Sequence, residues 1–181
     1  MTSAGIPQRA RALIDFWFGP AGDAARETHR DIWFRSAPEH DAQLRELFLA
    51  DYERAVHLKS DNVPALYQYG MALLDDGQLP EATATFDRVV QVSPHSPEGY
   101  YGRARVFAAR GEGPGAAEAL AEARKRVGAD ARAHLAEQGL KGAALDKATR
   151  DATDRSLAQM QNDPAFSRWA QDAGFQRTAW R

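Results

Sequence analysis

Two stretches of the chain match each other at a spacing of 34 residues, and this period constrains the fold more than any other feature. Gly77 recurs as Gly111, and Pro80 recurs as Pro114. A fixed period of this length is typical of helix–turn–helix repeat arrays, in which each unit packs only on its neighbours. The sequence therefore predicts an all-α solenoid of antiparallel helix pairs. Further matched pairs are Ala82 and Ala116, Phe86 and Leu120, Leu66 and Tyr100, and Leu73 and Phe107.

Turn signals and apolar spacing divide the chain into three parts. Residues 1–62 carry aromatic-rich N-terminal helices and a degenerate half repeat, residues 63–130 carry two repeats, and residues 131–181 carry C-terminal capping helices and a tail. Gly77 and Gly111 are expected to end helices in the left-handed conformation. Residues 174–181 are expected to form a loosely held tail, with the alternative that Phe175 and Trp180 tuck into the body. The helices are predicted at 7–18, 39–58, 63–75, 80–92, 97–109, 114–126, from about 130 to 139, at 142–161, and in a short segment after Asp163-Pro164.

The repeated unit resembles the tetratricopeptide repeat. That family places a bulky residue, an apolar–Gly pair, another bulky residue, a Gly turn, Ala, an aromatic residue and a closing Pro in order. The second copy is the weaker one, because Arg103 and Gly128 stand where an apolar residue and the proline are expected. The first copy reads Leu66, Tyr69, Gly70, Leu73, Gly77, Ala82, Phe86 and Pro94, and the second reads Tyr100, Arg103, Ala104, Phe107, Gly111, Ala116, Leu120 and Gly128.

A second resemblance lies nearer the start of the chain. Residues 15–19 read Asp-Phe-Trp-Phe-Gly, a Trp-Phe pair follows at Trp33, and a helix opening at Asp41 ends in Tyr-Glu-x-Ala at residues 52–55. This order is similar to the opening of the domain of unknown function 924 family. The resemblance covers about a quarter of the chain and implies an all-helical fold like a tetratricopeptide array. It implies no chemistry.

Composition narrows the classes of partner. With 23 basic and 25 acidic side chains the net charge is −2, so a nucleic-acid partner is not expected. The longest early apolar run is interrupted by Asp15 and is too short to span a bilayer, so we expect a cytoplasmic protein that does not bind a membrane.

The chain has no cysteine, and its five histidines show no ligand spacing, so no metal or other cofactor is expected. The basic run 124–126 is expected to complement a helix-end dipole.

The predicted function is a non-catalytic protein-interaction module, an adaptor, scaffold or chaperone-like protein that binds a peptide or helix in a groove lined by the first helix of each repeat. Tetratricopeptide proteins that clamp a terminal carboxylate use Lys, Asn and Arg there; Tyr67, Gln68 and Met71 replace them, so an apolar ligand is expected. Arg105 is predicted to pair with an acidic group of that ligand. The partner-binding residues are predicted to be Tyr67, Gln68, Met71, Leu74, Asp75, Glu98, Tyr101 and Arg105, and the wider lining to include Pro64, Gly102, Ala108 and Ala109.

Two alternatives remain open. The first is an enzyme or small-molecule binder with a pocket between residues 15–41 and the repeat array, where aromatic residues stand beside Glu27, Asp31, Glu39 and Asp41. The second is a groove filled by the chain's own tail, with Phe175 and Trp180 as plugs.

Overall fold

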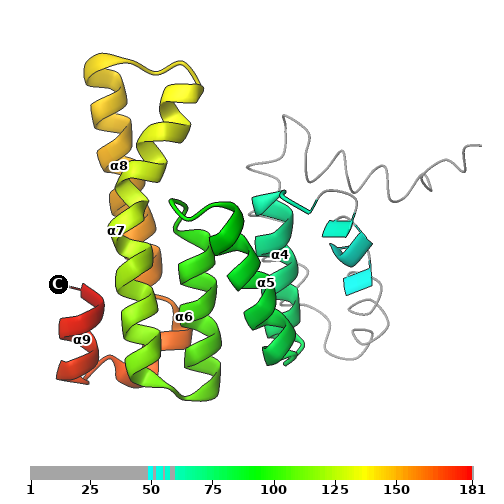
Figure 1. The fold of residues 1–181 in the computed structure, drawn as a ribbon. Helices are drawn as coiled ribbons and strands as arrows, with labels where there is room; N and C mark the ends of the chain where they lie inside the picture. The colour runs from blue at the N-terminus through cyan, green and yellow to red at the C-terminus, as the bar shows by residue number, and fades with distance from the viewer. Residues whose placement is uncertain (1–48, 51, 55, 58–59, 181) are drawn as a thin grey trace, which may run out of the picture. The chain divides into compact units, whose positions relative to one another are not determined.

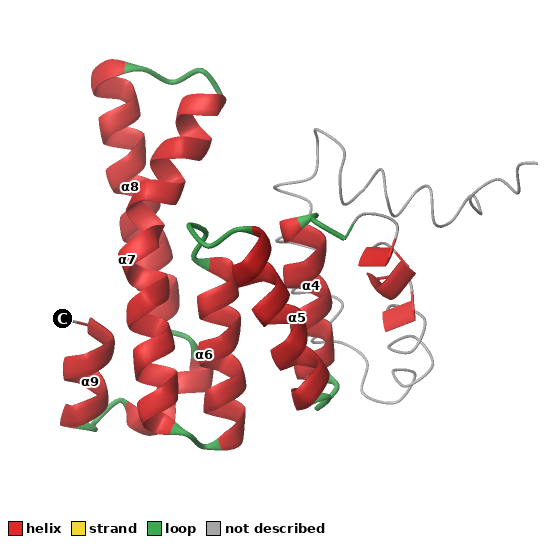
Figure 2. Ribbon diagram, in the orientation of Figure 1, coloured by secondary structure: helices red, strands yellow, loops and turns green. Residues whose placement is uncertain are grey.

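The computed structural model describes residues 49–50, 52–54, 56–57 and 60–180. Contacts divide the chain into two units, Met1–Asp51 and Tyr52–Arg181, and the helices from residue 52 onward belong to the second unit. Every regular element in the described ranges is a helix (Figure 2), as the 34-residue period predicts. The described residues between 49 and 57 are helical, in agreement with the helix expected at 39–58, whereas the predictions for residues 1–48 lie outside the described residues.

Consecutive helices run back and forth and pack against one another (Figure 1). The first helices of the two repeats, α4 (Val63–Asp75) and α6 (Glu98–Arg110), also contact each other, so the repeats lie side by side as predicted. Among the residues that the structure describes, no helix is both long enough and apolar enough to cross a membrane. The elements are α4 (Val63–Asp75), α5 (Leu79–Val92), α6 (Glu98–Arg110), α7 (Gly113–Glu137), α8 (Gly142–Gln161), the 3-10 helix η1 (Pro164–Trp169) and α9 (Ala173–Trp180).

The turns inside the two repeats have the same backbone conformation. Gly77 has a φ of +79° and Gly111 a φ of +78°. In each turn the next residue donates its N–H back to the helix, from Gln78 to the Leu73 carbonyl and from Glu112 to the Phe107 carbonyl, both at 2.9 Å. A left-handed residue at this position is the usual helix end, and glycine adopts it without strain. The predicted role of both glycines is therefore confirmed.

Phe86 fills the space where the two repeats meet. Its side chain is fully buried between two glycines on the first helices. A Cβ atom placed on Gly70 would lie 2.7 Å from the Phe86 ring, and one placed on Gly102 would lie 2.1 Å from it. The absence of side chains at these positions is what lets α4, α5 and α6 approach so closely. Gly102 and the buried Ala108 thus belong to the packing between helices, and the prediction that they line the groove is wrong.

The second repeat departs from the prediction after residue 126. The helices expected at 114–126 and near 130–139 are one continuous helix, α7, which ends at Glu137, with Gln138 as its C-cap before the left-handed Gly139. Gly128 does not break it, because one interior glycine costs only about 1 kcal/mol relative to alanine and the surrounding residues favour helix. Helix α7 packs against α8, on which only Leu145 and Met160 are buried.

The expectation of a loose C-terminal tail is wrong, and its alternative, that Phe175 and Trp180 tuck into the body, is confirmed. Instead of a loose tail the C-terminal residues form α9, whose Phe175 and Ala179 side chains are buried against the core around α7. Asp172 accepts a hydrogen bond at 2.7 Å from the Phe175 backbone N–H, and the Trp169 and Phe175 rings stack with centroids 5.4 Å apart. Burial of the Phe175 ring and its stacking on the half-buried Trp169 ring supply the stabilisation that a polar tail lacks.

Candidate functional site

Four of the eight predicted partner-binding residues lie together on one surface. We call this surface, formed by Tyr67 and Met71 of α4 and by Tyr101 and Arg105 of α6, the first-helix face. The Arg105 Nη1 atom lies 3.6 Å from the Met71 sulfur, and these residues are 34 positions apart. Tyr67 and Arg105 both influence the pKa of the Tyr101 hydroxyl electrostatically: Tyr67 raises it and the charge of Arg105 lowers it. The repeat period therefore brings equivalent positions of the two units into contact, as expected for stacked repeats.

A carboxylate from the C-terminal part of the chain lies on the first-helix face. The Tyr101 hydroxyl donates a hydrogen bond to Asp163 Oδ2. Arg105 Nε lies 3.6 Å from the same oxygen, within ion-pair distance but too far for a hydrogen bond. The Asp163 side chain is only 10% exposed and that of Arg105 is 26% exposed. A carboxylate held in such a position needs both partners to offset its loss of water.

Phe166 follows Asp163 onto the same face. Its ring is buried, with its centroid 6.3 Å from that of Tyr101. The geometry comes from the start of η1, where Asp163 Oδ1 accepts a hydrogen bond at 2.9 Å from the Ala165 N–H and Pro164 occupies the first helical position. This short turn presents a carboxylate and an aromatic ring together to α6.

The environment of Tyr101 keeps its hydroxyl protonated. Burial raises the pKa of Tyr101 far above its ordinary value, and the hydrogen bond to Asp163 and its negative charge raise it further. The Arg105 charge opposes this shift only in part. At any physiological pH Tyr101 is therefore a hydrogen-bond donor to a carboxylate, and it cannot serve as a base.

The other predicted residues are placed differently. Gln68 and Leu74 are half-buried on α4, and Asp75 is exposed at its last residue. Glu98 faces α7 instead: burial raises its pKa, the charge of Asp130 raises it further and that of His134 lowers it. Its Oε2 atom is buried and has no hydrogen-bond partner. The prediction counted Glu98 by its place in the repeat, but at the first residue of α6 its side chain is turned toward the following helix.

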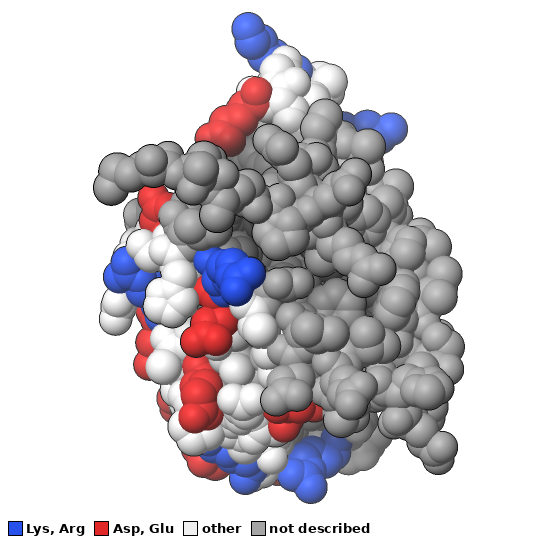
Figure 3. All heavy atoms as spheres, turned by 90° about the vertical axis from the view of Figure 1, so that its right-hand side faces the viewer, with Lys and Arg blue, Asp and Glu red and all other residues white. Residues whose placement is uncertain are grey.

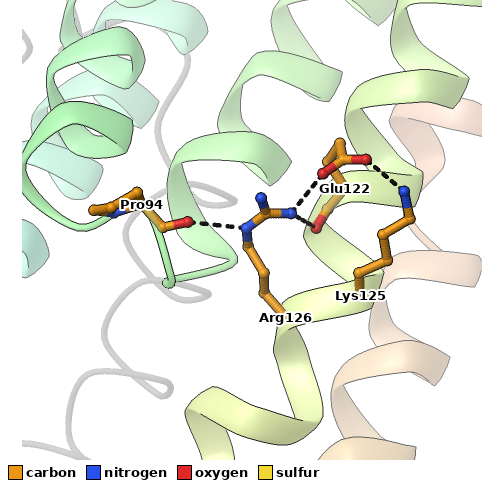
Figure 4. A network of polar contacts seen from close by, with 4 residues as sticks. All are labelled: Pro94, Glu122, Lys125 and Arg126. Atoms are coloured by element: carbon orange, nitrogen blue, oxygen red, sulfur yellow. Dashed lines mark hydrogen bonds and ion pairs between the residues drawn. The ribbon is translucent and has the colours of Figure 1, made fainter.

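The basic run at 124–126 has a structural role that the sequence did not indicate. It lies within α7, so the prediction of a helix-end dipole complement is wrong. Figure 4 shows Arg126 linking the α5–α6 connection to α7: its Nε donates to the Pro94 carbonyl at 2.9 Å, and its Nη1 donates to the Glu122 carboxylate at 2.7 Å. The guanidinium carbon also lies 3.8 Å from the centroid of the Tyr100 ring. Lys125 contacts only Glu122 in this network.

Surface charge shows no preference of sign on the described part of the face in Figure 3. Lysine and arginine side chains are interspersed with aspartate and glutamate there. Mixed charge of this kind produces no field of a single sign over the described part of that face.

The family comparison agrees with the repeated geometry. A tetratricopeptide repeat family model matches residues 73–140, a span of two 34-residue periods that covers α5, α6 and α7. This segment is similar to tetratricopeptide repeats. Tetratricopeptide domains are in general protein-interaction modules, and the fold prediction is confirmed. No curated protein and no solved structure matches the chain.

The tetratricopeptide match gives no support to the resemblance to the domain of unknown function 924 family. The residues that carry that resemblance lie almost entirely outside the described part of the chain, as does the pocket considered for residues 15–41. The family resemblance and the pocket both stay predictions.

The sequence missed the residues that occupy the tetratricopeptide first-helix face. The sequence identifies Asp163 as a helix cap and Phe166 as a residue of a short helix. Both lie outside the two repeats, so the 34-residue period does not predict their contacts. The predicted plugs are elsewhere: Phe175 packs against Phe166 and Trp169, and Trp180 packs at the edge of the same core. The alternative in which Phe175 and Trp180 of the tail plug the face is therefore wrong, and the residues that contact the face precede the tail.

Proposed function

We propose that this protein is a non-catalytic interaction module, an adaptor or scaffold that binds an extended or helical segment of a protein partner on its first-helix face. The observation that supports it is that Tyr101 and Arg105 already hold a carboxylate and an aromatic ring that belong to another part of the chain. A face that binds one segment in this way has the donors and the apolar surface that peptide recognition requires.

The chemistry of the face suits a mainly apolar ligand with one acidic group. Met71 provides a flexible, polarisable side chain that adapts to different apolar shapes, and Tyr67 and Tyr101 provide flat apolar rings. Arg105 provides one cation, which favours one carboxylate at a defined place along the ligand. Gln68, Leu74 and Asp75 are also on α4 and are proposed to contact other parts of the ligand.

The test is partner capture by the full chain. Affinity purification followed by mass spectrometry would identify the partner, and purified partner would then be titrated against variants. We expect Tyr67→Ala combined with Tyr101→Ala to abolish binding while helicity by circular dichroism is kept. Arg132→Ala, which breaks the exposed ion pair with Asp146 on α7 and α8, is the matched control and should bind normally. Unchanged binding by the double tyrosine variant would reject the first-helix face as the site.

A further inference from the structure

The segment that lies on the first-helix face has the character of a ligand. Residues 163–166 present a carboxylate to Tyr101 and Arg105 and an aromatic ring to Tyr101, while η1 as a whole is a single 3-10 helix of six residues. Short 3-10 helices have poorer hydrogen-bond geometry than α-helices. The segment is therefore held mainly by what it contacts on α6 and in the adjoining core.

The ion pair between the segment and the face is incomplete. Arg105 Nε is buried and makes no hydrogen bond, because Asp163 Oδ2 stays 3.6 Å away. An arginine can make two parallel hydrogen bonds to a carboxylate that approaches in the plane of its guanidinium group. A carboxylate on a separate ligand is free of the backbone constraints of η1, so it can pair with Arg105 better than Asp163 does.

From these observations we propose that residues 163–166 are an internal occupant of the first-helix face, and that the partner carries the same pair of groups, a carboxylate followed three residues later by an aromatic side chain. This inference rests on the proposed function and specifies its ligand. The partner must displace the internal segment, which is covalently linked and thus present at a high effective concentration. Binding to the unaltered protein is consequently weak, and any change that loosens the segment strengthens it.

The probe is a fluorescein-labelled peptide with the sequence of residues 160–169, titrated against the full chain by fluorescence anisotropy. The opening variant is Asp163→Asn, because asparagine keeps the N-cap hydrogen bond to Ala165 but loses the charge that pairs with Arg105. We expect this variant to bind the peptide about tenfold more tightly than the unaltered protein. Adding Arg105→Ala should remove the gain. A peptide that carries Asn and Ala at the Asp163 and Phe166 positions should not bind.

Displacement itself can be observed separately, because the chain contains no cysteine. An environment-sensitive dye on Ser167→Cys, at an exposed position of η1, should change its emission when the peptide is added. The same dye on Gln91→Cys, at an exposed position of α5, should not respond. Asp146→Asn, which removes one carboxylate from an exposed ion pair between α7 and α8, is the matched charge control and should leave peptide affinity unchanged.

The outcomes separate the two proposals. If the folded Asp163→Asn variant fails to bind the peptide, or the dye at residue 167 does not respond, residues 163–166 are a permanent part of the core and the internal-occupant proposal is overturned. The proposed function would survive that result as long as partner binding still depended on Tyr67 and Tyr101. If the peptide binds and displaces the segment but partner binding is indifferent to both tyrosines, the proposed function fails instead.

Discussion

The hydroxyl of Tyr101 donates a hydrogen bond to the carboxylate of Asp163, and these residues are 62 positions apart. The contact joins the first helix of the second repeat to the segment that follows α8. It is a tertiary contact between the tetratricopeptide segment and the residues C-terminal to its family match.

The first prediction concerns this hydrogen bond. Tyr101→Phe keeps the ring that packs near Phe166 but leaves Asp163 with Arg105 as its remaining side-chain partner on α6. We expect the free energy of unfolding to fall by roughly 1–3 kcal/mol, since a buried carboxylate loses a donor. Urea denaturation monitored by circular dichroism would measure it. In combination with Asp163→Asn the loss should be smaller than the sum of the two single losses, and strict additivity would show that the two groups do not interact.

The second prediction concerns Glu98 and pH. Burial raises the pKa of Glu98, so the folded state holds its proton more tightly than the unfolded state does. This contribution to stability is present at pH values below the ordinary carboxyl pKa and is lost as the pH rises through the folded value. Glu98→Gln removes the charge, so at pH 7 it should be more stable than the unaltered protein, by on the order of 1 kcal/mol.

The gain from Glu98→Gln should vanish near pH 4, where the unaltered side chain is protonated as well. Thermal unfolding at several pH values would measure both limits. Glu81→Gln is the control, because Glu81 also lies in the first turn of its helix, α5, but is exposed. An equal effect of the two substitutions at every pH would contradict burial as the cause.

The third prediction concerns the contact between the repeats. Gly102→Ala would place a Cβ atom 2.1 Å from the Phe86 ring, so α6 must shift or the ring must move. Crowding of this kind in a packed core costs about 1–3 kcal/mol. Because Phe86→Leu shortens the side chain, Gly102→Ala should cost much less in a Phe86→Leu background. If the cost is the same in both backgrounds, the glycine is needed for some reason other than the ring.

The fourth prediction concerns Arg126, which bonds to both Pro94 and Glu122 and lies over the Tyr100 ring. Arg126→Ala should lower the free energy of unfolding by roughly 2–3 kcal/mol, because a backbone carbonyl and a carboxylate each lose a charged donor. Arg126→Lys should recover only part of this, since an ammonium group lacks the planar fork that reaches several partners at once.

Lys125→Ala is the neighbouring control for the Arg126 series. Its ammonium contacts Glu122 at 2.6 Å on an exposed part of α7, and exposed pairs contribute less than about 1 kcal/mol. Guanidinium chloride unfolding would compare the three variants. Similar losses for Arg126→Ala and Lys125→Ala would mean that Arg126 acts only as a surface charge.

The order of helices and turns could be predicted from the sequence because it depends on local chemistry repeated at a fixed interval. Gly77 and Gly111 end their helices since only glycine adopts a φ near +79° freely, and small residues such as Gly70 stand where a ring must fit. The period also predicted that Tyr67, Met71, Tyr101 and Arg105 would share a face. These conclusions need only the spacing along the chain.

Contacts between residues that the 34-residue period does not relate were decided by the tertiary structure. Three features depend on residues distant in sequence. They are the continuity of α7 through Gly128, the direction of Glu98 toward a ligand or the next helix, and the identity of the residues that lie on α6. Asp163 shows the reason: its cap on η1 is local and could be predicted, but its bond to Tyr101 depends on how α7, α8 and η1 turn the chain back. The local role of a side chain follows from its neighbours in sequence. Its contacts with distant residues depend on the path of every helix that lies between the two residues in the chain.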